Sequence, residues 1–173
     1  MHPISIVSTG ERRNGGTRPL RLVACVAALL LVACSEQAPP AAEAVVEKTL
    51  RPADAALVAD GAKVYRQHCA SCHGARLEGQ PDWRTRGADG LLPAPPHDAS
   101  GHTWHHADEL LFRITKDGVA VIAGGDYKTA MPVYDGVLSD AEIVAVLSWI
   151  KAQWPADIQA KHDQINQRYR QSR

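Results

Sequence analysis

The sequence predicts an all-α domain over residues 54–154, about one hundred residues long, which is enough for one compact domain. Two observations predict it. Apolar residues recur at helical spacing in several stretches, and these stretches are separated by segments rich in glycine and proline. The longest such segment, residues 74–102, has no periodic pattern, and a loop of that length usually has a functional reason. No internal repeat is visible, so we expect a single domain.

The first helix is expected to begin after Asp54, whose carboxylate suits an N-cap position, and to run to His68. Its small and apolar positions are Leu57, Val58, Gly61, Val64 and Tyr65. A glycine, Gly74, follows shortly afterwards and breaks the helical pattern.

Two further helices are expected. One begins near Ala107, because the two acidic residues that follow would lie at the positive end of its dipole, and it stops at Gly118. The last helix has the clearest start, since Ser139 and Glu142 fit a capping box and Leu138 is placed to pack onto the first turn. Its apolar positions are Ile143, Val146, Leu147 and Ile150.

Residues 69–73 read Cys-Ala-Ser-Cys-His, and a Cys-x-x-Cys-His run is the attachment signature of c-type haem. Cys69 and Cys72 can each add to one vinyl group of the haem and form a thioether. His73 follows directly and is therefore placed beneath the iron. The run occurs once in the chain, so we expect one covalently bound haem c.

A Cys-x-x-Cys pair alone also occurs in redox-active dithiols and in zinc sites. A zinc site would need two more ligands at matching spacing, and the chain has no second cysteine pair downstream. A thioredoxin-like dithiol is expected inside a βαβ pattern, which this sequence lacks. Haem attachment is therefore the preferred interpretation.

Residues 1–33 are predicted to be a signal peptide, because a basic stretch precedes an apolar run that is too short to span a bilayer. The run ends in Leu-Val-Ala-Cys34, which resembles a bacterial lipobox, where the signal is cut before the cysteine and that thiol is lipidated. Ser35 follows rather than aspartate, which resembles outer-membrane sorting. We expect a lipid anchor at Cys34 on a membrane facing the periplasm, the outer membrane rather than the inner one. An ordinary signal peptide with an incidental cysteine is the alternative.

The compartment and the haem motif agree, because covalent haem attachment in bacteria takes place outside the cytoplasm. Residues 34–53 are rich in alanine, proline and glutamate and are predicted to tether the domain to the lipid. Residues 155–173 form a polar tail that either continues as a helix on the domain or frays, and we assign it no function.

The charge of the mature chain gives no reason to expect nucleic acid binding. The whole chain has 19 basic and 19 acidic residues, and the signal peptide removes four arginines and one glutamate, which leaves a net charge of −3.

Met131 is the only methionine besides Met1, which leaves with the signal peptide. If a thioether completes the iron coordination opposite His73, Met131 alone can supply it. Pro132 follows and stiffens the loop before the last helix. The competing ligands are His97, His102, His105 and His106. The run over residues 102–106 also resembles a copper or zinc tract, although capping, packing and bonds to haem propionates are the simpler interpretation.

These residues together resemble class I cytochrome c over about residues 54–154. The motif at residues 69–73, the Met131 loop and the first and last helices carry the resemblance. It implies a fold in which those two helices cross while loops wrap one covalently bound haem.

The resemblance also implies specific contacts. Gly61 and Tyr65 on the first helix should meet Trp149 on the last, because only glycine lets the backbones approach so closely. The carbonyl of Pro95, with that of Pro96 as runner-up, should accept a hydrogen bond from the ligand histidine. One departure is residue 97, a histidine where many members have an apolar residue, and it is expected to reach a propionate.

His73 and Met131 as axial ligands would raise the haem potential relative to two histidines and leave no vacancy on the iron. The sequence therefore predicts a one-electron carrier, not an enzyme, that meets its redox protein donor and acceptor transiently. One alternative is a haem-based sensor or gas-binding protein with a displaceable Met131, which carbon monoxide binding would distinguish. The other is a periplasmic copper-binding protein that uses residues 102–106.

Overall fold

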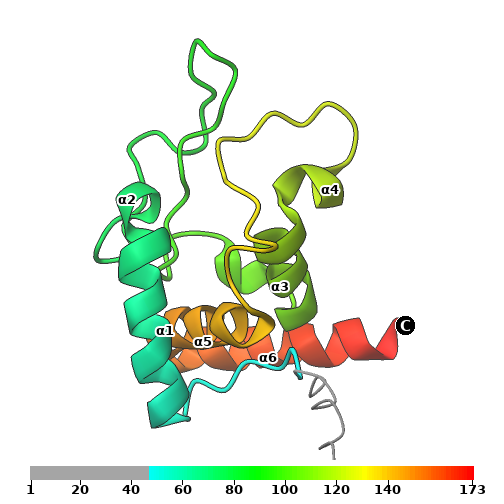
Figure 1. The fold of residues 1–173 in the computed structure, drawn as a ribbon. Helices are drawn as coiled ribbons and strands as arrows, with labels where there is room; N and C mark the ends of the chain where they lie inside the picture. The colour runs from blue at the N-terminus through cyan, green and yellow to red at the C-terminus, as the bar shows by residue number, and fades with distance from the viewer. Residues whose placement is uncertain (1–46) are drawn as a thin grey trace, which may run out of the picture. The chain divides into compact units, whose positions relative to one another are not determined.

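The computed structural model describes residues 47–173 (Figure 1). The predicted signal peptide, Cys34 and residues 35–46 of the predicted tether lie outside this range. The regular structure between residues 47 and 173 is entirely helical, which confirms the all-α prediction. Its elements are α1 (Ala55–His68), α2 (Ala70–His73), the 3-10 helix η1 (Thr103–His105), α3 (Asp108–Asp117), α4 (Val119–Ala123), α5 (Asp140–Ala152) and α6 (Ala156–Gln171).

Helices α1 and α5 cross at Gly61, as predicted. A Cβ atom on this buried residue would overlap the carbonyl oxygen of Ala145 and lie 2.9 Å from the Cβ of Trp149. Next to the crossing, the rings of Tyr65 and Trp149 pack with centroids 4.5 Å apart. The absence of a side chain at Gly61 therefore sets the distance between the two helices.

The helix ends follow the capping rules that the sequence indicated. The Asp54 carboxylate accepts a hydrogen bond from the backbone N–H of Leu57 at 3.1 Å, which caps α1. At the start of α5, the Ser139 hydroxyl accepts from the N–H of Glu142, and the Glu142 carboxylate accepts from the N–H of Ser139 at 2.9 Å. Leu138 is buried beside this capping box.

Helix α3 runs from Asp108 to Asp117, close to the predicted bounds, and Gly118, with a φ of 92°, is its C-cap residue. The short α4 that follows directly was not predicted. Its five residues are all apolar and none is buried. An apolar run of that length has no polar face from which a helical period can be recognised.

The core lies between α1, α3 and α5. Tyr65 of α1 and Phe112 of α3 are almost fully buried against α5, whose four predicted apolar positions are all buried. Trp154 extends this core beyond the end of α5.

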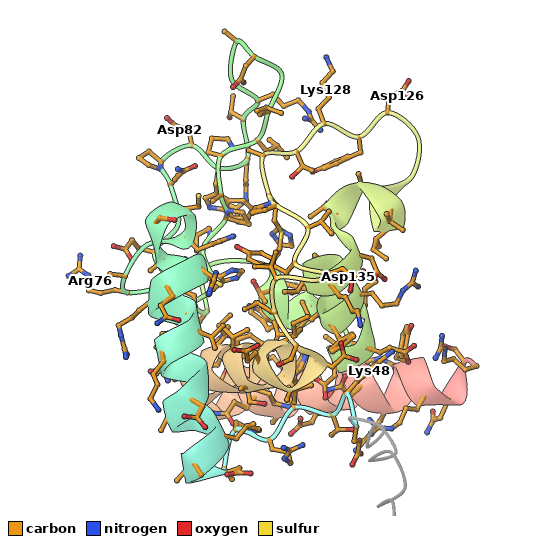
Figure 2. All side chains as sticks on the ribbon, viewed as in Figure 1. Lys48, Arg76, Asp82, Asp126, Lys128 and Asp135 are labelled. Carbon is orange, nitrogen blue, oxygen red and sulfur yellow. The ribbon has the colours of Figure 1, made fainter. Side chains whose placement is uncertain are left out.

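Two long loops meet at one end of the helices, at the top of Figure 1. The Arg86 guanidinium lies over the Tyr127 ring at 5.3 Å from its centroid, so the loop of residues 74–102 touches the loop that leads to Met131. Figure 2 shows Lys128 and Asp126 at this end, whereas Arg76 projects outward beside α2.

The last residues of the predicted tether segment are part of the folded domain. Leu50 is only 4% exposed and belongs to the hydrophobic core, and its N–H donates to the buried Asp108 carboxylate at 3.0 Å. The next N–H, of Arg51, donates to the Ser148 hydroxyl. These bonds join residues far apart in the sequence, so composition alone gave no sign of them.

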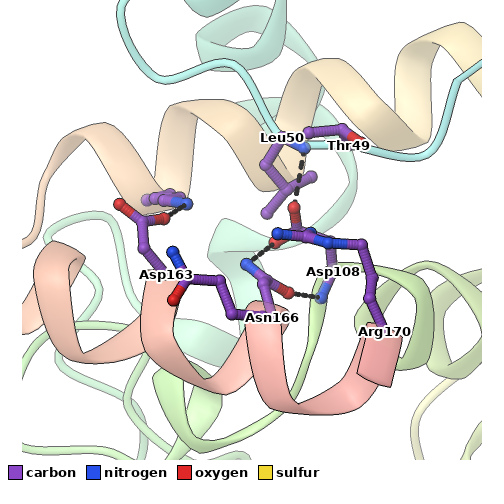
Figure 3. Close-up of a pocket in the computed structure, with 8 residues that line it drawn as sticks. Thr49, Leu50, Asp108, Asp163, Asn166 and Arg170 are labelled. Atoms are coloured by element: carbon purple, nitrogen blue, oxygen red, sulfur yellow. Dashed lines mark hydrogen bonds and ion pairs between the residues drawn. The ribbon is translucent and has the colours of Figure 1, made fainter. Parts of the chain in front are cut away.

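The polar tail is the helix α6, the first of the two expected alternatives. Asn166 of α6 exchanges two hydrogen bonds with Asp108, accepting from its N–H at 2.7 Å and donating to its carboxylate at 2.9 Å (Figure 3). Lys151 of α5 donates to Asp163 of α6 at 2.6 Å. Figure 3 shows the pocket between α6 and the segment at Leu50, which is lined by Thr49, Leu50, Asp108, Lys151, Asp163, Asn166, Gln167 and Arg170.

His162 of α6 is fully buried next to Asp108. Its Nε2–H donates to the carbonyl of His106 at 2.9 Å and lies 3.4 Å from the Asp108 carboxylate. Its Nδ1 is buried without a hydrogen-bond partner. Burial lowers the pKa of His162, the Lys151 charge lowers it further, and Asp108 and the His106 carbonyl oppose them. The neutral ring is therefore the form that the fold requires.

A histidine whose folded pKa lies below its unfolded value binds protons more readily in the unfolded chain. We therefore expect His162 to make the free energy of unfolding fall as the pH drops below about 6.5. His162→Gln keeps a donor for the His106 carbonyl and cannot titrate, so its stability should fall less between about pH 7 and pH 5. Denaturant unfolding of both haem-loaded proteins across this range measures the difference, and parallel pH profiles would contradict the assignment.

Candidate haem site

The two motif cysteines lie on one helical turn. Cys69 joins α1 to α2, and its carbonyl accepts hydrogen bonds from the N–H groups of Cys72 at 3.1 Å and His73 at 2.9 Å. Residues three apart in a helix share a face. Cys69 is partly buried against the core and Cys72 is exposed. The turn thus presents two thiols and an imidazole from five consecutive residues.

The state of the Cys69 thiol argues against a redox dithiol. Burial, followed by the neighbouring Cys72, raises the pKa of Cys69 to about 11. A reactive dithiol of the thioredoxin type requires a lowered pKa, because the thiolate is the nucleophile. The raised pKa therefore disfavours thiol–disulfide exchange at Cys69.

His73 is oriented by the residue that the resemblance indicated. Its Nδ1 lies 2.8 Å from the Pro95 carbonyl oxygen, which can only accept, so Nδ1 carries the proton. Burial lowers the pKa of His73, and the bond to Pro95 partly opposes that effect. The neutral ring then has its lone pair on Nε2, the atom available to a metal. The site thus fits a haem iron.

The long loop is built to hold Pro95 in this place. The N–H of Gly79 donates to the His73 carbonyl at 2.8 Å, and a Cβ on Gly79 would lie 2.7 Å from the Pro95 carbonyl carbon. The N–H of Gln80 donates to the Ala94 carbonyl at 2.9 Å, and the N–H of Ala94 donates to the side-chain carbonyl of Gln80 at 2.8 Å. Residues 79–80 therefore hold the segment around Pro95 in place, and positioning this carbonyl for His73 is a structural role for the long loop.

Met131 lies in a loop that is tied to the same region. It is partly buried and packs against the same core as Cys69. Its N–H donates to the Thr129 hydroxyl at 3.0 Å, and three residues later the Tyr134 hydroxyl donates to the His68 carbonyl at 2.7 Å. Because His68 directly precedes Cys69, Tyr134 links the methionine loop to the haem motif. The sequence analysis missed Tyr134, whose partner lies 66 positions away.

His97 lies against His73, and its expected contact with a haem propionate stays a prediction. Its ring stacks on that of His73 with centroids 3.9 Å apart and planes inclined by 21°. Its Nδ1 is 2.8 Å from the Thr103 hydroxyl. Burial, and then the neighbouring His73 and His102, lower the pKa of His97 well below its ordinary value. Position 97 thus places a second imidazole ring flat against His73.

The other three histidines are accounted for by packing, the simpler of the two interpretations. His102 stacks on Trp83, His105 stacks on Trp104 with centroids 3.7 Å apart, and His106 meets the edge of His102. Among residues 47–173, no group of three or more His, Cys, Asp or Glu side chains is placed to hold a metal ion. The copper alternative gains no support from this geometry.

Comparison with known families agrees with the site. A family model described as cytochrome c matches residues 58–154, the stretch from the first turn of α1 to Trp154, just after the end of α5. No solved structure matches the chain.

Proposed function

The chain belongs to the cytochrome c family, which makes it a haem-binding electron carrier, and we propose that His73 and Met131 are the two axial ligands of its iron. The observation that carries the proposal is the hydrogen bond from His73 Nδ1 to the Pro95 carbonyl. That bond fixes the tautomer in which Nε2 is unprotonated, so its lone pair is available to a metal. The bond also restrains the orientation of the ring. When bound, the haem takes up and releases one electron as its iron changes between the ferric and ferrous states.

The protein's own residues would set how easily that exchange occurs. The soft sulfur of Met131 favours the ferrous state and raises the potential relative to a second histidine. Pro132 and the Thr129 hydroxyl restrain the backbone around Met131. If His73 and Met131 both held the iron, no position would be left on it for a substrate. Such an iron suits electron transfer and not catalysis on a bound substrate. Contacts with the redox partners are expected to be brief, as they are in other small redox complexes.

Absorption spectra of the haem-loaded protein test the ligand pair. The ferric wild type should have the weak far-red band that methionine ligation produces, and Met131→Ala should lose it. Met131→Leu, which keeps most of the packing volume, should lose it too, because the sulfur is the cause. The exposed neighbour Val133, changed to alanine, should leave the band unchanged.

The same variants separate a carrier from a sensor. If Met131 holds the iron firmly, the reduced wild type should bind little carbon monoxide, whereas Met131→Ala should bind it readily. Ready binding by the wild type would favour a gas-binding protein with a displaceable Met131. Retention of the far-red band in Met131→Leu would remove Met131 as a ligand.

We also propose that the protein is exported and anchored by a lipid on Cys34 to the periplasmic side of a membrane, with the outer membrane preferred. The Leu-Val-Ala-Cys34 run and the need for haem attachment outside the cytoplasm support this. The chain between Cys34 and Leu50, where the folded domain begins, would then be the tether. Between residues 47 and 173, the structure has no helix long and apolar enough to cross a membrane.

Cys34→Ser should lack the lipid and keep residues 1–33, because the cut before a lipobox cysteine requires the lipidated thiol. Ser35→Ala, which alters the neighbouring residue but keeps the thiol, should be cut and lipidated. The intact mass of each haem-loaded protein, purified from cells that express the full-length chain, measures both changes. If Cys34→Ser is cut at the same place as Ser35→Ala and both lack a lipid, the lipid anchor is wrong and the haem proposal is unaffected.

A further inference from the structure

The imidazole of His73 is restrained on its flat face as well as at its edge. The Pro95 carbonyl holds the edge through Nδ1 at 2.8 Å, and the His97 ring lies nearly parallel on the face, with centroids 3.9 Å apart. One hydrogen bond alone restrains the ring plane weakly, because the χ2 torsion of histidine is broad and hydrogen bonds tolerate about 30° of misalignment. A ring packed flat against the face blocks that rotation.

His97 is itself held at three separate points. Its N–H donates to the Leu77 carbonyl at 2.8 Å, and its carbonyl accepts from the Trp154 indole N–H at 2.7 Å. Its ring Nδ1 pairs with the hydroxyl of Thr103, which is buried. Both the backbone and the ring of His97 are therefore fixed, so the residue is a rigid support.

The backbone that holds His97 contains a strained residue. Leu77 has a φ of 70°, a left-handed conformation that costs a leucine about 1 kcal/mol or more. In that conformation its carbonyl accepts from the N–H groups of both His97 and Asp98, while its side chain is buried in the core. Such strain persists only where the surrounding structure determines the conformation, and it is concentrated at functional sites.

We propose that His97 is a positioning residue that fixes the plane of the His73 imidazole relative to the haem. The inference rests on the proposed ligation of the iron by His73. The plane of an axial imidazole determines which iron orbitals it overlaps, so a ring held at one angle gives one electronic state. A carrier whose ligand keeps the same orientation in both oxidation states has little to rearrange when an electron moves.

Electron paramagnetic resonance of the frozen ferric haem protein tests this, because its g values depend on the axial ligand plane. His97→Leu should shift and broaden the low-spin signal, since leucine fills space without a flat surface. His97→Phe restores a flat ring and should stay closer to the wild-type signal. His105→Leu is the matched control, because that histidine is exposed and stacks on Trp104 instead of the ligand.

A second variant acts from the far side of His97. Thr103→Val keeps the shape of a buried residue and removes only the hydroxyl that holds the His97 ring, so a smaller broadening of the same kind is expected. A wild-type signal from either His97→Leu or Thr103→Val would overturn the inference, as would equal disturbance by leucine and phenylalanine. A wild-type protein without a low-spin signal of two axial protein ligands would instead count against the proposed function.

Discussion

Replacing Gly61 with valine is expected to lower the free energy of unfolding of the haem-loaded protein by about 3 kcal/mol or more. A Cβ at this position would overlap the Ala145 carbonyl oxygen and approach the Trp149 Cβ. The first obstacle is backbone, which cannot rotate away as a side chain can. Helices α1 and α5 would have to separate, and the packing of Tyr65 on Trp149 would be lost with them. Denaturant unfolding followed by far-ultraviolet circular dichroism measures the effect.

The control is Ala59→Val, on the same helix but at an exposed position. It introduces the same β-branched residue and should cost only about 0.5 kcal/mol through helix propensity. Gly61→Ala tests whether the added methyl group raises or lowers the stability of the protein. At an exposed helical position this change stabilises by about 1 kcal/mol, whereas at the crossing it should destabilise. If Gly61→Val is as stable as Ala59→Val, the close crossing is not needed for the fold.

The crossing also connects the core to the haem motif. The hydroxyl of Tyr65 donates to the Gly74 carbonyl at 2.8 Å, directly after His73. Because Tyr65 lies one helical turn after Gly61, the contact that fixes α1 against α5 also anchors the end of the motif. A displaced α1 is therefore expected to disturb the site as well as the core.

Features governed by local rules could be predicted from the sequence. The N-cap at Asp54 and the capping box at Ser139 depend on residues three apart, so the sequence alone specifies them. The acceptor at Pro95 and the contact at Gly61 came instead from the family resemblance, which carries long-range geometry that local rules do not. The structure has both.

What could not be predicted depends on partners that are distant in the sequence. The burial of Leu50 and the docking of α6 both depend on Asp108, whose side chain bonds to residues 58 positions away on either side. The stacking of His97 on His73 likewise requires the left-handed turn at Leu77, and leucine is not a residue that signals such a turn. The sequence showed that position 97 is a histidine where an apolar residue is common, but it did not show that this ring would stack on His73.

Replacing both Cys69 and Cys72 with serine is expected to abolish covalent haem attachment completely. Each thioether needs one sulfur, and serine cannot form that bond. The mass of the intact polypeptide under denaturing conditions should fall to that of the bare mature chain. Ser71→Ala changes the exposed residue between the two cysteines and should leave the haem-loaded mass in place. A double variant that still carries the mass of haem would show that another residue forms the link.

Denaturing conditions are essential to this test, because the rest of the site remains when the sulfurs are lost. His73 keeps its bond to Pro95, and His97 still supports its face. The double variant can therefore retain haem without a covalent bond in its folded state, and its native absorption alone would not distinguish the two. Each single variant should keep one thioether and hence the full haem mass in the fraction that matures. The exposed thiol of Cys72 and the partly buried one of Cys69 then differ only in how readily the remaining bond forms.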